Sequence, residues 1–359
     1  MRTRSTARFF VVLAFALAAC GSPAASPSAA ASPSMAASPS MAAAPSGRWP
    51  ISDLPTIGTP ADDGARIVKV DTLDARTRDL TIESPSVGTV QARLLLPASF
   101  AADPAARFPA LYLLHGADGE YTDWTAKSDV EGITAPTNFL VVMPAAASSF
   151  VGEGNTQGSG KLGRAVWEPF HATELTQLME RNWQASDARA LAGLSLGGYG
   201  AIALAARHPG LYDAVASYSG ALDIKGAVST YLPNLDTATL AKIQDIIDLA
   251  AGYGTYSVVE LAPLLRGTKS VFVSYGNGKP GPLDPPDRRF PSPLEKWCGG
   301  GSDLFVGELR KAGIPVTVDN YGDGTHSWEY WERELRLSLP RLLEAVGETP
   351  PPPSASPGA

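Results

Sequence analysis

The sequence predicts an α/β fold in which helices cover both faces of a mostly parallel central sheet. Short apolar runs rich in β-branched residues, each bounded by glycine, proline or polar residues, indicate strands. Helical patterns separate several of these runs, and strands that alternate with helices are typical of a parallel sheet. The part of the chain that carries these patterns, residues 48–347, has a length that α/β folds often use as one domain.

The expected elements follow from these patterns. Strands are expected at Val90–Leu96, Ala110–Leu114, Phe139–Met143, Ala188–Leu194, Ala214–Tyr218, Ser270–Tyr275 and Val316–Asn320. Helices are expected at Glu174–Trp183, Leu196–Arg207, Ser302–Lys311 and Trp328–Leu343. Two stretches without a pattern, Ser148–Gly163 and Asn277–Pro293, are expected to be long loops, which often shape a binding cleft.

Both ends of the chain differ from this domain in composition. Residues 1–19 combine three arginines with the apolar run Phe9–Ala19, which is typical of a signal peptide and too short for a stable membrane anchor. Residues 22–46 contain only Ala, Ser, Pro and Met, so residues 20–47 are expected to form a disordered tether. The proline-rich tail, residues 348–359, is also expected to be disordered.

Cys20 lies between the signal segment and the tether. The string Leu17-Ala18-Ala19-Cys20-Gly21 resembles a bacterial lipoprotein processing box, in which Cys20 becomes the mature N-terminus and carries lipid. We therefore expect an exported, extracytoplasmic protein that is held at the cell membrane by its N-terminal lipid. The alternative is an ordinary signal peptide in which a cysteine follows the cleavage site by chance.

The composition excludes several classes of partner. The chain has 36 acidic and 29 basic side chains, a net charge of −7 and no basic run, which argues against nucleic acid as the main partner. Cys20 and Cys298 are too few for a disulfide framework or a cysteine-based zinc site, so no metal is expected. If Cys20 carries lipid, Cys298 is left as a free thiol.

The strongest motif lies where one expected strand meets the next helix. Gly193-Leu194-Ser195-Leu196-Gly197 has the G-x-S-x-G pattern, with a strand before it and a helix after it. In this nucleophile elbow, glycines two residues on either side of the serine permit a sharp turn. Ser195 then lies at a helix N-terminus, where free N–H groups favour a developing anion. The pattern predicts a serine nucleophile in an α/β-hydrolase fold.

The order of nucleophile, acid and histidine in such a hydrolase selects the histidine. Only His208 and His326 follow Ser195. His208 ends the same helix, roughly 20 Å from the serine at 1.5 Å per residue, and is expected to be structural. His326 lies in a loop between the last expected strand and helix, so it is predicted to be the catalytic base. His171 is expected to be structural.

The remaining site residues are less tightly constrained. His115 ends an expected strand and belongs to the loop that supplies the second oxyanion donor, so the donors are expected to be the backbone N–H groups of Ala117 and Leu196. The acid should lie between the strand Ser270–Tyr275 and His326. The candidates are Asp284, Asp287, Glu295 and Asp303, and spacing alone allows any of the first three.

Several strings resemble the antigen 85 mycolyltransferases and the related esterase-D-like α/β-hydrolases. They are Leu113-Leu114-His115-Gly116, Trp167-Glu168 with Phe170, the elbow, Tyr275-Gly276-Asn277-Gly278-Lys279-Pro280, and Gly324-Thr325-His326-Ser327-Trp328-Glu329-Tyr330-Trp331. In that family the acid is a Glu in a Leu-Glu pair between the last two strings. Leu294-Glu295 stands there, so the resemblance implies that Glu295 orients His326, with Asp284 as the second choice.

The sequence also departs from that family. The mycolyltransferases have Asp-Gly-Leu-Arg where this chain has His115-Gly116-Ala117-Asp118, so the contacts to a trehalose head group do not carry over. The family's disulfide has no counterpart, and the segment Pro280–Pro293 is an insertion rich in proline.

Three functions are weighed on these grounds. The first is a serine esterase that acts on carboxylic esters through a Ser-Glu-His triad and an acyl-enzyme, without a cofactor. The second is an acyltransferase that moves an acyl chain from an acyl-lipid substrate to a sugar or alcohol. The third is a non-catalytic surface binding module, against which Ser195 and His326 argue.

Overall fold

The computed structural model describes residues 55–117, 119–146, 153–154, 165–223, 226 and 258–351. All of these residues lie in one compact unit, Gly47–Ala359. The signal segment, Cys20 and the tether lie outside the described residues, as do Asp118 and most of the expected loop Ser148–Gly163. Among the described helices, none combines the length and apolar character that crossing a membrane requires.

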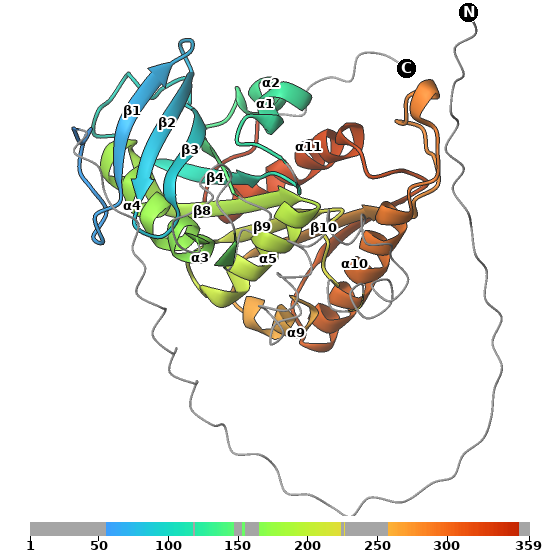
Figure 1. Cartoon of the computed structure of the whole chain (residues 1–359). Helices are drawn as coiled ribbons and strands as arrows, with labels where there is room; N and C mark the ends of the chain where they lie inside the picture. The colour runs from blue at the N-terminus through green and yellow to red at the C-terminus, as the bar shows by residue number, and fades with distance from the viewer. Residues whose placement is uncertain are drawn as a thin grey trace, which may run out of the picture. The chain divides into compact units, whose positions relative to one another are not determined.

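A twisted sheet of nine strands forms the centre of the described domain (Figure 1). Its spatial order is β1-β2-β3-β5-β4-β8-β9-β10-β11. The strands are β1 (Arg66–Thr72), β2 (Thr77–Ser84), β3 (Gly88–Leu95), β4 (Phe108–Leu114), β5 (Leu140–Pro144), β8 (Ala185–Leu194), β9 (Ala214–Tyr218), β10 (Ser270–Gly276) and β11 (Thr317–Gly322). The six neighbouring strands β5, β4, β8, β9, β10 and β11 run parallel to one another, whereas β1, β2 and β3 pair antiparallel. A separate short hairpin pairs β6 (Glu153–Gly154) with β7 (Ala165–Val166).

Helices connect the parallel strands. They are α1 (Asp123–Lys127), α2 (Val130–Thr134), α3 (Trp167–Pro169), the π-helix η1 (Phe170–Glu174), α4 (Leu175–Asn182), α5 (Leu196–Arg207), α9 (Val258–Leu261), the 3-10 helices η3 (Ala262–Leu265) and η4 (Pro286–Arg288), α10 (Pro293–Lys311) and α11 (Trp328–Ala345). Figure 1 shows α4, α5 and α10 on one side of the sheet and α1, α2 and α11 on the other.

The packing of β4 shows why both faces are covered. All of its residues are buried, and alternate side chains point to opposite faces of a strand. Tyr112 and Leu114 belong to the apolar cluster that also contains Ile202 of α5 and other side chains of α4 and α10. Leu111 and Leu113 belong to the cluster formed with α1, α2 and α11. A strand buried on both faces reads as a continuous apolar run, which confirms the predicted class of fold.

The short helices α1, α2, α3 and α9 were not expected, β6 lies within the expected loop Ser148–Gly163, and two longer parts of the fold also differ from the prediction. Strands β1 and β2 were not expected, because they lie at the edge of the sheet and carry many charged, half-exposed residues in place of an apolar run. Helix α10 begins at Pro293, nine residues before the expected Ser302. The run Gly299–Gly301 has low helix propensity, but the Ser292 side chain caps the helix by accepting from the Glu295 N–H at 3.1 Å.

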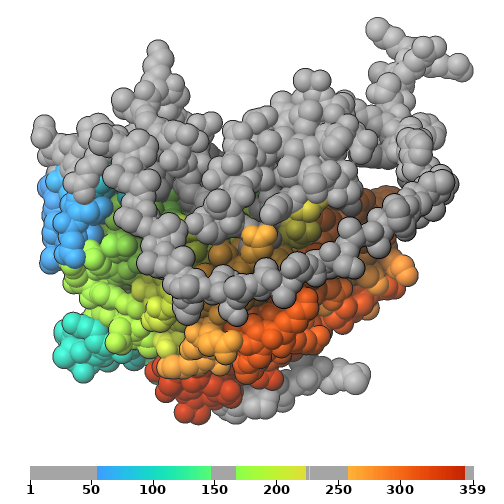
Figure 2. Space-filling view, turned by 90° about the horizontal axis from the view of Figure 1, so that it is seen from below, coloured from blue at the N-terminus to red at the C-terminus, as the bar shows by residue number. Residues whose placement is uncertain are grey.

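The two edges of the sheet lie far apart in the domain. Figures 1 and 2 both place the first strands, in blue, and α10, in orange, at opposite ends of the domain. Because β4, β8, β9, β10 and β11 are parallel, their carboxyl ends lie side by side. This row of strand ends is the sheet edge at which the candidate site lies. The predicted site residues follow these carboxyl ends, which is where open α/β sheets bind ligands.

Candidate active site

Ser195 occupies the turn between β8 and α5. Its φ and ψ angles are 53° and −120°, a left-handed conformation that residues other than glycine rarely adopt. Two backbone hydrogen bonds fix the turn: the Ser195 N–H donates to the Tyr218 carbonyl at 2.9 Å, and the Ala221 N–H donates to the Ser195 carbonyl at 3.0 Å. Strain of this kind persists only where the surroundings impose it, and it is typical of catalytic serines in an elbow.

The glycines of the motif are required by close backbone contacts. A Cβ on Gly193 would lie 2.3 Å from the Gly197 carbonyl oxygen, and a Cβ on Gly197 would lie 2.2 Å from the His115 carbonyl oxygen. The second contact also brings the β4 loop against the elbow. A Cβ on Gly116 would lie 3.8 Å from the Ser195 Oγ, so this loop borders the serine hydroxyl.

The two predicted oxyanion donors follow residues of this turn and of the loop that borders it. Leu196 is the first residue of α5, so its N–H has no carbonyl acceptor within the helix. Ala117 directly follows Gly116. The His115 ring fixes this loop: its Nε2 accepts from the Ala146 N–H at 3.1 Å, and its Nδ1 donates to the Gly116 carbonyl at 2.7 Å. Burial lowers the pKa of His115, which keeps the ring neutral, as this pattern requires.

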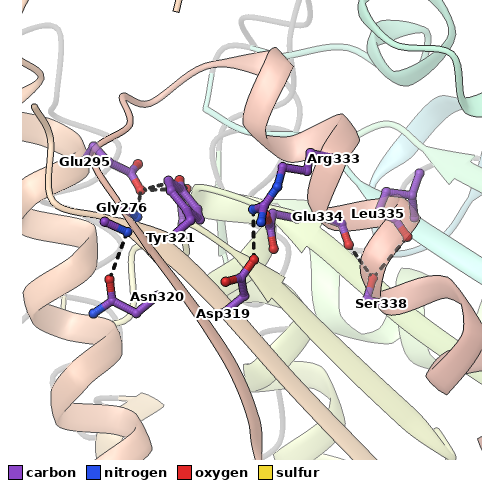
Figure 3. A network of polar contacts seen from close by, with 11 residues as sticks. Gly276, Glu295, Asp319, Asn320, Tyr321, Arg333, Glu334, Leu335 and Ser338 are labelled. Atoms are coloured by element: carbon purple, nitrogen blue, oxygen red, sulfur yellow. Dashed lines mark hydrogen bonds and ion pairs between the residues drawn. The ribbon is translucent and has the colours of Figure 1, made fainter. Parts of the chain in front are cut away.

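The structure brings Glu295 and His326 together. Glu295 lies in the first turn of α10 and is fully buried, and its Oε2 lies 2.7 Å from the His326 Nδ1. The other oxygen, Oε1, accepts from the Gly276 N–H at 2.7 Å and from the Ser219 and Tyr321 hydroxyls at 2.9 Å each. Figure 3 shows the Tyr321 hydroxyl directed at Glu295. Four partners therefore hold a buried carboxylate in one orientation.

The second nitrogen of His326 is placed differently. Its Nε2 is buried and has no hydrogen-bond partner among the described residues. The Trp331 ring lies against the imidazole edge-on, with 4.9 Å between ring centroids, and the His326 side chain is 9% exposed. Because Glu295 accepts at Nδ1, the neutral ring carries its proton there and Nε2 keeps a lone pair. An imidazole with this tautomer is suited to accept a proton.

The other acid candidates have different surroundings. Asp284 is buried, and it accepts from the Tyr330 hydroxyl at 3.0 Å, from the Gly281 N–H at 2.7 Å and from the Thr325 hydroxyl. It therefore fixes the backbone next to His326 without contacting the imidazole. Asp287 lies in η4, none of whose residues is buried, and Asp303 accepts from the Tyr275 hydroxyl.

Comparison with known proteins decides the family. The sequence profile of the family described as "Putative esterase" matches residues 87–288. The mycobacterial protein "Diacylglycerol acyltransferase/mycolyltransferase Ag85A" of Mycobacterium leprae is 31% identical over 258 residues, which cover 68% of this chain and 78% of that protein. This chain belongs to the esterase family. It is an enzyme of the ester hydrolase or acyltransferase type.

Solved structures of low sequence identity share the fold of this esterase. Mycobacterium tuberculosis MPT51 aligns with a TM-score of 0.57 at 23% identity, over 76% of this chain and all of that one. A ferulic acid esterase aligns with a TM-score of 0.56 at 22% identity, over 76% of this chain and 98% of that one. The fold is therefore the α/β-hydrolase fold predicted from the elbow.

The remaining histidines of the esterase lie in other environments. The His208 Nε2–H donates to the Glu168 Oε1, 2.9 Å away, and Arg207 donates to the same oxygen at 2.8 Å. His171 is buried and stacks on Trp167, with 5.8 Å between centroids, and burial lowers its pKa to about 3. Among the described residues no group of three or more His, Cys, Asp or Glu is placed to hold a metal ion.

Sequence reasoning missed two residues of the esterase that contact Glu295. Ser219 follows β9 and has a positive φ of 46°, and Tyr321 lies near the end of β11. Burial and the neighbouring Glu295 raise the pKa of Tyr321, so its phenol stays protonated and donates. The available signal was topological: both residues lie at carboxyl ends of parallel strands, as do Ser195 and His326.

Proposed function

We propose that this esterase cleaves carboxylic esters through Ser195, His326 and Glu295. The observation that carries the proposal is the Glu295–His326 contact of 2.7 Å. It leaves a buried Nε2, without a hydrogen-bond partner among the described residues, at the same sheet edge as the strained serine. An activated serine needs a base that is itself oriented by a third group, and these residues supply that arrangement.

In the first half of the reaction, the Ser195 oxygen attacks the ester carbonyl carbon and its proton passes to the His326 Nε2. The carboxylate of Glu295 stabilises the imidazolium, and the Leu196 and Ala117 N–H groups bind the oxyanion. The intermediate then collapses: the ester C–O bond breaks, and the alcohol leaves with the proton from His326. An acyl group remains on Ser195.

In the second half, water attacks the acyl carbon and gives a proton to His326. The bond to Ser195 breaks, the serine recovers its proton, and a carboxylic acid leaves. An alcohol in place of water would give a new ester by the same steps. The names of the relatives, diacylglycerol acyltransferase and mycolyltransferase, favour this acyl transfer as the second candidate.

A fluorophosphonate probe tests the nucleophile, because it reacts only with an activated serine. We expect labelling of the full chain, no labelling of Ser195→Ala, and unchanged labelling of Ser99→Ala, whose serine is exposed and outside the site. A folded wild-type chain that resists the probe would contradict the proposal. Adding a polyol acceptor to an ester assay then separates the candidates, because only the acyltransferase diverts product from free acid to new ester.

We further propose export and lipid attachment at Cys20, which rest on the string Leu17–Gly21 alone. Mass spectrometry of the protein from a bacterial host would detect a lipid-modified Cys20 at the mature N-terminus. Cys20→Ala is expected to abolish this modification and to leave residues 1–19 on the chain, because the processing box requires the cysteine. An unmodified Cys20 in the processed protein would exclude the anchor.

A further inference from the structure

The proline-rich segment Pro280–Pro293 carries exposed apolar side chains. Phe290 is 72% exposed, more than any other large hydrophobic residue that the structure describes, and Leu283 is 40% exposed. Leu294, in the first turn of α10, is 47% exposed. Figure 1 shows this segment, in orange with η4 at its tip, standing out from the domain beside α10 and α11. Exposed apolar side chains that gather on one projecting segment mark an interaction surface.

The base of the segment is tied to the domain. The Ser292 N–H donates to the Gly278 carbonyl at 2.7 Å, and the Gly281 N–H donates to the buried Asp284 carboxylate at 2.7 Å. From the other side of the loop, Arg289 donates to the Asp284 carbonyl at 3.1 Å. Phe290 therefore projects from an ordered turn in which every proline further restricts the backbone.

Basic side chains surround these apolar residues although the whole chain is acidic. The segment and its two flanks carry Lys279, Arg288, Arg289 and Lys296. Asp284 and Glu295 are buried and bonded inward, and Arg288 pairs with Glu329 of α11 at 2.5 Å. Asp287 is therefore the exposed acid of the segment beside Lys279, Arg289 and Lys296. From Lys279 to Lys296 the chain carries four basic and three acidic side chains, a net charge of +1, whereas the whole chain has a net charge of −7.

Two of these lysines line a groove. It has a volume of about 880 Å³ and runs along the start of α10, where Lys279, Lys296, Trp297 and one acidic residue, Asp223, contribute to its wall. Neither lysine forms an ion pair with another described residue. Their ammonium groups are thus available to an anionic ligand at the surface.

We propose that this surface, defined as Pro280–Pro293 with Lys279, Leu294 and Lys296, docks on a bilayer that contains anionic lipid. Phe290 and Leu294 enter the boundary between head groups and acyl chains, and the two lysines contact lipid phosphates. Apolar side chains beside basic ones are the pattern by which peripheral proteins bind anionic membranes. Charge complementarity favours such a bilayer over a neutral one or an acidic protein surface like that of this chain itself.

The docking surface is separate from lipid attachment at Cys20 and from ester chemistry. It lies after the carboxyl end of β10, the same sheet edge that carries the candidate active site. Docking would therefore bring that edge to the membrane, where acyl lipids are available as substrates. Docking can therefore be measured without following the turnover of an ester.

The test places an environment-sensitive fluorophore at position 290. The full chain carries Cys20→Ala to remove lipidation, Phe290→Cys is labelled, and the buried Cys298 is checked for labelling in a chain without the new cysteine. The matched control is Leu73→Cys, a 52% exposed leucine at the opposite end of the sheet. A local probe is needed because the apolar run of residues 9–19 can itself hold the chain on vesicles.

We expect a blue shift at position 290 with vesicles of equal parts phosphatidylcholine and phosphatidylglycerol, and none at position 73. The shift should be absent with pure phosphatidylcholine and should weaken as salt screens the charges. Lys279→Glu with Lys296→Glu should raise the lipid concentration that gives half of the shift at position 290 about tenfold or more, with fluorophosphonate labelling unchanged.

Three results would overturn the proposal. They are equal shifts at positions 290 and 73, an equal shift with neutral vesicles, and a shift that depends on protein concentration without vesicles, which would identify a contact between copies of the chain. None of these measurements requires turnover. Failure of docking would leave fluorophosphonate labelling of Ser195 intact, and failure of labelling would leave the fluorescence shift intact.

Discussion

Two Glu–His pairs occur in the described part of this molecule, and they differ in almost every other respect. In the first, Glu295 contacts the His326 Nδ1 at 2.7 Å, and the opposite ring nitrogen is buried without a described partner. In the second, Glu168 contacts the His208 Nε2 at 2.9 Å and shares the same oxygen with Arg207. The His208 side chain is 32% exposed, whereas that of His326 is 9% exposed.

The comparison teaches that a Glu–His contact alone does not mark a catalytic pair. Glu168 has a guanidinium to balance its charge, so it behaves as part of a structural ion pair. His208 follows the last residue of α5, and Ser195 precedes the first, so the helix separates them by about 20 Å. His326 differs from His208 in two respects. Glu295 contacts its Nδ1 and leaves Nε2 available, and the residue follows the carboxyl end of β11.

The largest effect is expected from removing each imidazole. His326→Ala should lower kcat for an aryl ester roughly 10⁴-fold or more, because Ser195 loses its base. His208→Ala should change kcat less than about twofold and cost about 1 kcal/mol of unfolding free energy, because it removes one hydrogen bond to a carboxylate. Steady-state kinetics and urea unfolding measure the two effects.

Each of these two variants serves as the control for the other, because both remove one imidazole. Circular dichroism verifies that both chains fold, and fluorophosphonate labelling reports the serine without a complete turnover. If His208→Ala lost as much activity as His326→Ala, the distinction between a structural and a catalytic pair would be wrong.

The next largest effect separates the two carboxylates. Glu295→Gln keeps the size of the side chain but removes the charge that stabilises the imidazolium, so kcat should fall roughly 10²- to 10⁴-fold. Glu168→Gln should leave kcat unchanged. Asp284→Asn gives a third comparison, since its effect should come with a lower melting temperature through the Thr325 and Tyr330 contacts. If Asp284→Asn lowered kcat more than Glu295→Gln did and left the melting temperature unchanged, Asp284 would be the acid of the triad.

These residues also show what could be predicted from sequence. Ser195 and His326 followed from a local motif and from chain order, which need no three-dimensional information. Spacing left Asp284, Asp287 and Glu295 open as the acid, because loop length does not state which carboxylate faces the ring; a family resemblance favoured Glu295. The partners Ser219 and Tyr321 could not be derived, since their contact with Glu295 depends on the register of β9, β10 and β11.

The errors in the fold have a similar cause. The long apolar runs of β4, β5 and β8 were predicted because burial on both faces leaves a local signal. Strands β1 and β2 were missed because charged residues interrupt their apolar pattern, among them Arg66 and Glu83, which pair across the two strands at 3.0 Å. The start of α10 was missed because tertiary packing and a Ser292 cap outweigh the low helix propensity of three glycines.

The structural pair should have a signature in the pH dependence of stability. Burial alone would raise the pKa of Glu168, but hydrogen bonds from His208 and Arg207 outweigh it and hold the pKa below 4.5. A depressed folded-state pKa contributes stability above pH 4.5 that is lost as the pH falls through the lower value. Wild type should therefore exceed Glu168→Gln by about 1–2 kcal/mol at pH 6, and the gap should shrink towards pH 3. Urea unfolding at each pH measures this gap, and a constant gap would contradict the assignment.

The smallest expected effect concerns Tyr321, whose hydroxyl is one of three donors to the Glu295 Oε1. The ring is held independently of the hydroxyl: it stacks on Tyr330 with 4.9 Å between centroids, and Arg333 lies 5.7 Å above it. Tyr321→Phe should therefore keep the packing and remove only the hydrogen bonds of the hydroxyl, to Glu295 and to the Ser219 hydroxyl.

With two donors left on that oxygen, kcat should fall by about 3- to 10-fold at unchanged KM, because the carboxylate is held less firmly against the imidazole. The acidic limb of the pH–rate profile should also shift, which a purely structural role would not produce. Tyr330→Phe is the matched control, since that hydroxyl donates to Asp284 and not to Glu295. Equal rates and equal pH profiles for Tyr321→Phe and wild type would show that the backbone N–H of Gly276 and the Ser219 hydroxyl suffice to orient the acid.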